Sequence, residues 1–211
     1  MATEMFHHKI VFIGPPGCGK STAIRAYSEI DPVSTDVKTN EVGVSKIKEM
    51  TTVALDYGSV VLDEETKIHL YGTPGQERFD FMWNILSEGS NGIVILVDHT
   101  VQDPLGRLDF YFNKFKDFLE KVPAVIGINK YDSPSPHGLT FDDYKAHVAK
   151  SNFSNIPLYE VDMRKAEDVR FLIMTLLFST PLSLQKELSS IEDKLSALDE
   201  KISLLDEHHK N

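Results

Sequence analysis

The sequence predicts an α/β protein whose mainly parallel β-sheet is wound on both faces by helices, giving three layers. Short apolar runs rich in Val and Ile alternate along the chain with segments whose apolar residues recur at helical spacing. The central runs are apolar at every position, which indicates strands buried on both faces of a parallel sheet. Ligands of such sheets bind beyond the carboxyl ends of the strands, so motifs at these ends are the candidate functional residues.

Each expected element follows from its local pattern. A β-branched run over 9–13 predicts the first strand, and a glycine-rich turn leads from it into a helix near residue 22. A polar stretch with little periodicity predicts a long loop over 31–49, and loops of that length are usually functional. The remaining expected strands are 51–62, 66–71, 92–98, 124–129 and one near 157–160, and the remaining expected helices are 79–88, 105–121, 141–150 and 169–178.

Composition restricts the classes of function. The chain has 211 residues and a net charge of −10, which argues against binding to nucleic acid or to anionic membranes. Its single cysteine excludes an intramolecular disulfide and fits a reducing compartment. No signal peptide, membrane-spanning run or lipidation motif is recognisable, so we expect a cytoplasmic protein without a direct membrane anchor.

The first strand is followed by a phosphate-binding motif. Residues 14–21 read Gly14-Pro15-Pro16-Gly17-Cys18-Gly19-Lys20-Ser21 and match G-x-x-x-x-G-K-[ST], between a strand and a helix as a P-loop requires. Successive backbone N–H groups at the helix N-terminus can surround a polyphosphate. Lys20 would reach the β- and γ-phosphates, and the Ser21 hydroxyl would bind Mg²⁺. The expected nucleotide-binding residues here are Gly14, Pro15, Gly17, Cys18, Gly19, Lys20, Ser21 and Thr22.

Cys18 has two interpretations. The nearby helix N-terminus could lower the pKa of its thiol and make it a redox sensor, or the side chain could simply fill space inside the loop. We favour space filling.

A second motif selects the base. Asn129-Lys130-Tyr131-Asp132 follows an apolar strand and matches N-K-x-D. The Asp132 carboxylate can accept both N–H donors of the guanine edge, which adenine does not offer. The Lys130 stem can lie over the purine, and Asn129 can tie the neighbouring loops together. An ordinary polar turn after a strand becomes a weak alternative once the P-loop is considered with it.

With both motifs in place, residues 9–165 resemble the Ras superfamily of small GTPases. Thr52-Val53-Ala54-Leu55-Asp56-Tyr57 resembles the end of switch I, and the stretch from Leu70 to Phe79 resembles switch II. The resemblance implies that Thr52 ligates Mg²⁺ and senses the γ-phosphate, with Thr51 as the alternative. It also implies that the Gly75 N–H bonds the γ-phosphate and that Gln76 orients the attacking water, which makes Gln76, Lys20 and Thr52 the expected catalytic residues.

The likeness is closest to prokaryotic members of the MglA type and to the group resembling the β subunit of the signal-recognition-particle receptor. In that group Asp162-Met163-Arg164 takes the place of the eukaryotic Ser-Ala-Lys loop, so the Met163 N–H would face the guanine carbonyl. The resemblance further implies an activator of roadblock fold and effectors that bind switch I and switch II. The expected activity is that of a GTP/GDP switch that hydrolyses GTP with Mg²⁺.

Three departures from the family pattern affect turnover. Gly72 stands where an Asp normally holds Mg²⁺ through water, which predicts a weakened or rearranged metal shell. Pro16 replaces a common Gly, and no Arg lies between Asp31 and Thr52, so switch I offers no arginine finger in cis. We therefore expect slow, activator-dependent hydrolysis, with a guanine-nucleotide-binding assembly scaffold of little turnover as the alternative.

Switch II is unusually apolar. Its side chains can pack on the domain core or form a surface for effectors that changes with the nucleotide, and some can do both. The residues concerned are Phe79, Phe81, Met82, Trp83, Ile85 and Leu86.

The C-terminal residues predict a separate helix after a GTPase domain of residues 1–180. From 181 to 211 apolar residues recur at heptad spacing, and the seam consists of Leu184, Leu188, Ile191, Leu195, Leu198, Ile202 and Leu205. Lys194 and Lys201 would meet Asp199 and Asp206 of a parallel partner, which favours a parallel homodimer through residues 184–205. A heterologous coiled-coil partner and a helix folded back on the GTPase domain are the alternatives.

Overall fold

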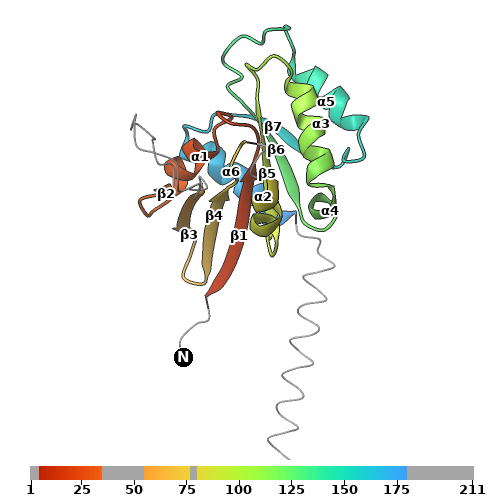
Figure 1. The fold of residues 1–211 in the computed structure, drawn as a ribbon. Helices are drawn as coiled ribbons and strands as arrows, with labels where there is room; N and C mark the ends of the chain where they lie inside the picture. Colours follow the sequence, from red (N-terminus) through yellow and green to blue (C-terminus); the bar gives the residue numbers. More distant parts are fainter. Residues whose placement is uncertain (1–4, 35–54, 77–79, 180–211) are drawn as a thin grey trace, which may run out of the picture. The chain divides into compact units, whose positions relative to one another are not determined.

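The computed structural model describes residues 5–34, 55–76 and 80–179, and these ranges contain seven strands and six helices (Figure 1). The strands are β1 (Phe6–Ile13), β2 (Val33–Ser34), β3 (Asp56–Val61), β4 (Thr66–Gly72), β5 (Gly92–Asp98), β6 (Ala124–Asn129) and β7 (Leu158–Val161). The helices are α1 (Lys20–Tyr27), α2 (Asp80–Ser87), α3 (Pro104–Lys114), α4 (Lys116–Leu119), α5 (Phe141–Ala149) and α6 (Ala166–Phe178).

The described strands form one sheet in the order β2-β3-β4-β1-β5-β6-β7. All pairings from β4 to β7 are parallel, whereas β3 runs antiparallel to β4 and β2 antiparallel to β3. The chain leaves β1 toward one edge of the sheet and later returns to place β5 on the other side of β1. This reversal makes the carboxyl ends of β1 and β5 the place where a ligand is expected.

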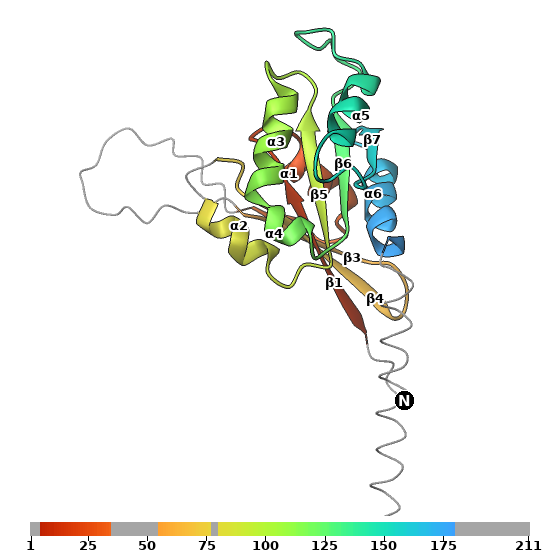
Figure 2. The ribbon, with the colours of Figure 1, turned by 90° about the vertical axis from the view of Figure 1, so that its right-hand side faces the viewer.

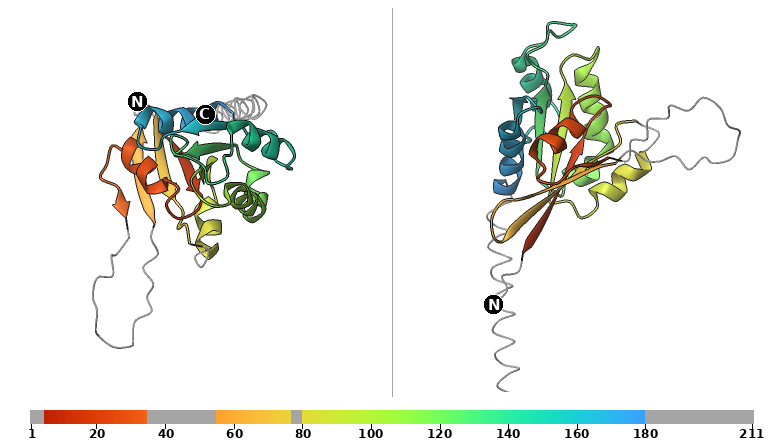
Figure 3. Two further views of the ribbon diagram at one scale, coloured as in Figure 1. Left: turned by 90° about the horizontal axis from the view of Figure 1, so that it is seen from above. Right: turned by 90° about the vertical axis from the view of Figure 1, so that its left-hand side faces the viewer.

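Helices cover both faces of the sheet, which confirms the three-layer prediction (Figures 2 and 3). One apolar cluster joins residues of β1, β5 and β6 to α2, α3, α4 and α5, while a second joins the opposite faces of these strands to α1 and α6. Alternate residues of β1 belong to the two clusters: Val11 and Ile13 to the first, Ile10 and Phe12 to the second. This alternation is the two-residue period of a strand buried on both sides.

The predicted helix over 105–121 is interrupted. Phe115, with φ −105° and ψ 13°, leaves helical geometry, and the chain resumes as the short α4. Its ring is fully buried and stacks on Trp83 at a centroid distance of 5.5 Å. The backbone break thus keeps an aromatic side chain in the core, and helical periodicity alone does not reveal such a break.

Apart from the strand over 51–62, the other predicted strands and helices agree with the observed bounds to within three residues, and strands 92–98 and 124–129 agree at both ends. The short strand β2 was not predicted, because it lies inside the polar stretch over 31–49 that was expected to be a loop. The predicted strand over 51–62 is described only from residue 55 onward and runs as β3 from Asp56. The described residues up to Leu177 form one compact unit, and the predicted tail helix over 181–211, with its heptad seam, lies outside the described residues. Within the described ranges, no helix has both the length and the apolar character needed to cross a membrane.

Candidate nucleotide-binding site

The P-loop connects β1 to α1 at the predicted edge of the sheet. Gly19 precedes α1 with φ +112°, a conformation that residues with a side chain rarely adopt. A Cβ on Gly19 would also collide with the Asn129 side-chain amide, so the loop approaches the end of β6 as closely as a glycine permits. The motif therefore needs a glycine at position 19 for two steric reasons, the positive φ and the close approach to Asn129.

Lys20 lies inside the loop and is 6% exposed. Its Nζ donates to the Gly14 carbonyl at 2.6 Å and to the Pro15 carbonyl at 2.8 Å. Both of these partners are neutral. The Nζ also donates to the Cys18 Sγ at 3.6 Å. No carboxylate among the described residues pairs with the Lys20 ammonium group. A nearly buried cation whose described partners are neutral is suited to meet an anion such as a phosphate.

Cys18 belongs to the same loop, and its side chain is fully buried. Burial raises the pKa of its thiol, and the Lys20 ammonium offsets this effect only in part. The Lys20 backbone N–H at the helix N-terminus does lower the pKa of the Cys18 thiol, but burial raises it by more, so the expectation of a net lowering is wrong. The structure supports the space-filling interpretation.

Ser21 contacts a carboxylate that the sequence analysis did not assign. Its Oγ donates to Asp56 Oδ2 at 2.5 Å. Asp56 opens β3 and stands directly opposite Gly72 in the antiparallel ladder with β4. A Cβ on Gly72 would lie 3.2 Å from the Asp56 Cβ and 3.3 Å from its Oδ2. A side chain at position 72 would therefore be in tight contact with Asp56 and with the Ile24 Cδ1, which would lie 3.1 Å from its Cβ.

The sequence analysis expected a weakened or rearranged metal shell because Gly72 replaces an Asp, and the pairing of Asp56 with Gly72 bears on the rearranged alternative. A carboxylate lies beside Ser21, but it comes from β3 instead of β4. A signal was present in the sequence, since an Asp inside a predicted strand is unusual and this one faces a glycine once the hairpin is in register. Within the described ranges, no three His, Cys, Asp or Glu side chains gather as a metal-binding group.

Asn129 joins the two motif loops, as the sequence predicted. Its Nδ2 donates to the Cys18 carbonyl at 2.9 Å, and its Oδ1 accepts from the Met163 N–H at 3.2 Å. The Met163 N–H, expected to face a guanine carbonyl, is therefore occupied by Asn129 in this structure. One buried amide fixes the P-loop, the end of β6 and the 162–164 loop relative to one another.

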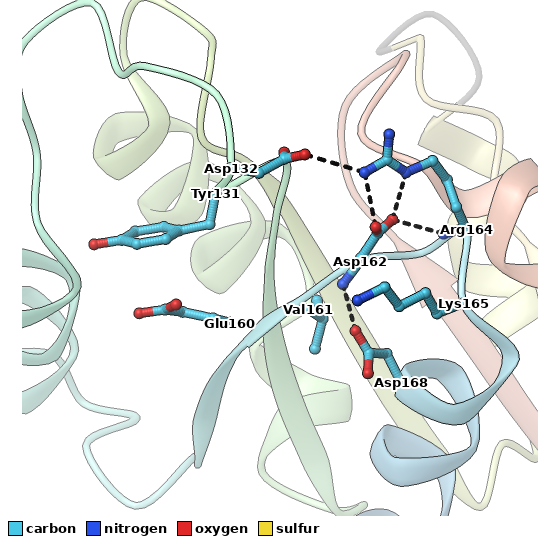
Figure 4. Close-up of a pocket in the computed structure, with 8 residues that line it drawn as sticks. All are labelled: Tyr131, Asp132, Glu160, Val161, Asp162, Arg164, Lys165 and Asp168. Atoms are coloured by element: carbon cyan, nitrogen blue, oxygen red, sulfur yellow. Dashed lines mark hydrogen bonds and ion pairs between the residues drawn. The ribbon is translucent and has the colours of Figure 1, made fainter.

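Asp132 and Asp162 share a guanidinium group (Figure 4). Arg164 donates to both oxygens of Asp162 at 2.7 Å and to Asp132 Oδ2 at 3.1 Å. These bonds lower the pKa of Asp162 to about 2. The Asp132 side chain is 65% exposed, so in this state its carboxylate is accessible to a base.

Lys130 is held by a second carboxylate absent from the sequence analysis. Its Nζ pairs with Asp98 Oδ2 at 2.5 Å, at the end of β5. Hydrogen bonds from Lys130 and Thr100 hold the pKa of Asp98 below its usual range, against the opposing effect of burial. Lys130 also adopts φ +61°, which is uncommon for a residue with a side chain. These constraints fix the stem that was predicted to lie over a purine.

The motif residues enclose a pocket of about 260 Å³. Its walls come from the P-loop, α1, the N-K-x-D loop and the 162–164 loop, and they comprise Gly17, Gly19, Thr22, Asn129, Lys130, Asp132, Ser133, Asp162 and Arg164. A wider hollow of about 530 Å³ adjoins it and shares Asp132, Asp162 and Arg164 (Figure 4). The pocket therefore joins Gly17, Gly19 and Thr22 of the predicted phosphate-binding set to the predicted base-binding residues of the two other loops. Lys20 and Ser21 belong to the same loop and helix but do not line this pocket.

Switch II reaches the P-loop through Gly75, because a Cβ there would collide with the Pro15–Pro16 backbone. Gln76 is exposed, while Thr52, together with its alternative Thr51, lies outside the described residues. The apolar side chains of α2 divide between the two interpretations. Trp83 and Leu86 are buried, and Phe81 and Ile85 are 54% and 59% exposed.

Comparison with known proteins gives a family and several relatives. The model of a family described as conserved hypothetical ATP-binding proteins matches residues 12–203. An uncharacterised protein of Methanocaldococcus jannaschii is 34% identical over 59% of this chain and 70% of its own length. The mutual gliding-motility protein MglA of Myxococcus xanthus is 27% identical over 72% of this chain and 79% of its own.

Eukaryotic relatives extend the set. The GTP-binding protein YPT1 of Saccharomyces cerevisiae is 25% identical over 84% of this chain and 81% of its own. The chain therefore belongs to the family described as conserved hypothetical ATP-binding proteins, and its relatives include small GTPases of the Ras superfamily.

Proposed function

We propose that this chain is a guanine-nucleotide switch that binds GTP and GDP and hydrolyses GTP slowly until a partner accelerates it. The observation that carries the proposal is the Asn129 amide, which joins the P-loop to the 162–164 loop beside Asp132. A phosphate-binding loop and a carboxylate suited to guanine thus line one pocket. The name of the relative YPT1, a GTP-binding protein, supports the binding of guanine nucleotides.

The polyphosphate would lie in the P-loop, with Lys20 exchanging its bonds to Gly14 and Pro15 for bonds to phosphate oxygens. Charge-assisted bonds to phosphate are stronger than bonds to neutral carbonyls, so this exchange favours binding. The base would lie between the stem of Lys130 and the P-loop side of the pocket. Its two N–H donors would meet Asp132, whose Oδ2 accepts from Arg164 and whose other oxygen has no hydrogen-bond partner among the described residues.

The residues fit a Mg²⁺ ion. Ser21 and Asp56 offer hydroxyl and carboxylate oxygens, the hard ligands that Mg²⁺ prefers alongside phosphate oxygens and water. When bound, Mg²⁺ neutralises charge developing on the phosphates. Ser21 would hold the ion through its hydroxyl, and the Asp56 carboxylate beside it would supply negative charge to the site. We propose Thr52 as a second ligand, on the resemblance alone.

Hydrolysis would be an in-line attack of water on the γ-phosphate. Gln76 orients that water in the proposal, and the Gly75 N–H stabilises charge on the γ-phosphate oxygens. An activator of roadblock fold is proposed as the partner, with residues 1–180 as the switch domain and 181–211 as an oligomerisation helix.

The test is nucleotide binding followed by single-turnover phosphate release. Lys20→Ala should abolish binding of a fluorescent GTP analogue by titration, because the loop then has no cation for the phosphates. Micromolar binding retained by this variant would refute the P-loop assignment. Gln76→Leu should bind GTP as the wild type does but release phosphate at least about tenfold more slowly. Binding without Gln76-dependent release would favour the scaffold alternative.

A further inference from the structure

The switch II loop is anchored to the core at one peptide bond. Trp83, on α2, donates its indole Nε1–H to the Pro74 carbonyl at 2.8 Å. The indole is 2% exposed and packs among Tyr111 and Phe115 of the core. Trp83 is the single tryptophan of the chain, and its hydrogen bond joins the beginning of switch II to the following helix.

The anchored carbonyl belongs to the same peptide unit as the Gly75 N–H, the proposed γ-phosphate donor. Among the described residues no peptide bond is cis, so this unit is trans and its C=O and N–H point in opposite directions. The carbonyl points to the buried indole. The N–H is therefore directed away from the core, on a residue that lies against Pro15 and Pro16 of the P-loop.

Without the indole bond this peptide would turn easily. Rotation of the unit uses ψ of Pro74 and φ of Gly75, and glycine accepts almost any φ. The preceding residue cannot rotate as freely, because the Thr73 N–H and hydroxyl both bond the Phe12 carbonyl, at 3.0 and 3.2 Å. The Pro74–Gly75 peptide is thus the unit of this loop that can rotate most easily, and the hydrogen bond from Trp83 restrains its rotation.

We propose that Trp83 is a positioning residue that presets the direction of the Gly75 N–H and thereby sets the preference for GTP over GDP. This inference rests on the proposed guanine-nucleotide function. GDP lacks the γ-phosphate, so the alignment of this N–H contributes to GTP binding alone. Trp83 itself touches no nucleotide and acts through the peptide that it holds.

The test compares two core variants. Trp83→Phe keeps an aromatic ring but removes the N–H donor, and Phe115→Leu disturbs the same packing while leaving the donor in place. We expect Trp83→Phe to lower the ratio of GTP to GDP affinity about tenfold, the range of a hydrogen bond to a charged group. GDP affinity should stay within about twofold, and Phe115→Leu should leave the ratio unchanged. An equal shift in both variants, or no shift in either, overturns the proposal.

A measurement on the unmodified chain covers the case in which Trp83→Phe does not fold. With ¹⁵N-labelled tryptophan, the single indole N–H gives one resonance. It should exchange slowly with solvent in the complex with a non-hydrolysable GTP analogue, and rapid exchange there overturns the proposal. Binding of GTP and GDP by the wild type with an unchanged ratio in Trp83→Phe refutes the positioning role alone, whereas no guanine-nucleotide binding at all refutes the proposed function as well.

Discussion

Replacement of Asp56 by Asn tests whether the proposed Mg²⁺ site takes its carboxylate from β3 instead of β4. The substitution keeps the shape of a side chain whose Oδ2 lies 2.5 Å from Ser21 Oγ, and it removes one negative charge from the proposed Mg²⁺ site. Loss of an outer-shell partner typically weakens a metal about 10- to 100-fold, or about 1.4–2.7 kcal/mol. We expect the concentration of Mg²⁺ that half-saturates nucleotide retention to rise within that range.

The assay is a Mg²⁺ titration of the dissociation rate of a fluorescent GDP analogue. Glu64→Gln is the matched control, since Glu64 lies exposed in the turn between β3 and β4 and its replacement removes the same charge. The exchange variant Asp56→Gly/Gly72→Asp should recover at least half of the lost Mg²⁺ affinity in free-energy terms, because the two positions face each other across the ladder. Gly72→Asp alone should destabilise the fold, because its Cβ would lie 3.2 Å from that of Asp56.

A titration of Asp56→Asn that superimposes on that of the wild type would show that the carboxylate does not serve the metal. Failure of the exchange variant to recover affinity would show instead that the β3 position is required for another reason. If Glu64→Gln raised the half-saturating Mg²⁺ concentration by the same factor, the effect of Asp56→Asn would be one of overall charge and not of a metal site.

Three further predictions concern the base, the thiol and acid stability. Asp132→Asn should move the preference from guanine toward xanthine nucleotides, measured by competition, and an unchanged affinity for GTP would remove the guanine assignment. Cys18 should resist alkylation in the native protein at pH 8 and react fully in denaturant, because it is buried and its pKa is raised; rapid native labelling would contradict its space-filling role. The pKa of Asp162 should rise from about 2 toward its ordinary value in Arg164→Ala, as followed by NMR of the carboxyl carbon. Since the folded pKa is lowered, the stabilisation from this pair is present above about pH 4, the unfolded pKa, and is lost as the pH falls through about 2; an Asp162 pKa unaffected by the substitution would refute the pairing.

Local pattern was sufficient for most of the fold. The strands β5 and β6 were predicted at both ends because continuous Val and Ile runs terminate at polar motif residues, Asp98 and Asn129. The break at Phe115 was not predictable from the sequence. Phe115 is buried whether the helix is continuous or broken there, so the spacing of apolar residues is nearly the same in both cases. The phosphate- and base-binding residues were found from motifs because their spacing is set by a contiguous loop.

Contacts between residues that are far apart in the sequence could not be predicted from the motifs. Asp56 and Gly72 are brought together by the register of a hairpin, and a family pattern that expects an Asp at one position contains no rule for its neighbour across the ladder. The same holds for Asp98 and Lys130, which meet only because β5 and β6 are adjacent in the sheet. The hydrogen bond between Trp83 and Pro74 likewise depends on how α2 packs on the domain. The apolar pattern of α2 could not predict that packing, because it allowed both a core and a surface role for these side chains.

The family description names ATP, whereas several relatives are named as GTP-binding or Ras-related proteins, and the chemistry of the pocket favours guanine. Asp132 accepts one bond from Arg164 through Oδ2, and its other oxygen has no partner among the described residues. A guanine edge presents two adjacent N–H donors, which suit an ionised carboxylate with free lone pairs. An adenine edge would set the lone pair of its ring nitrogen against that carboxylate while displacing water from it, and an unpaired acceptor costs about 1–3 kcal/mol or more when charged. Since a P-loop would hold the phosphates of either nucleotide alike, we expect this difference at the base to set the preference.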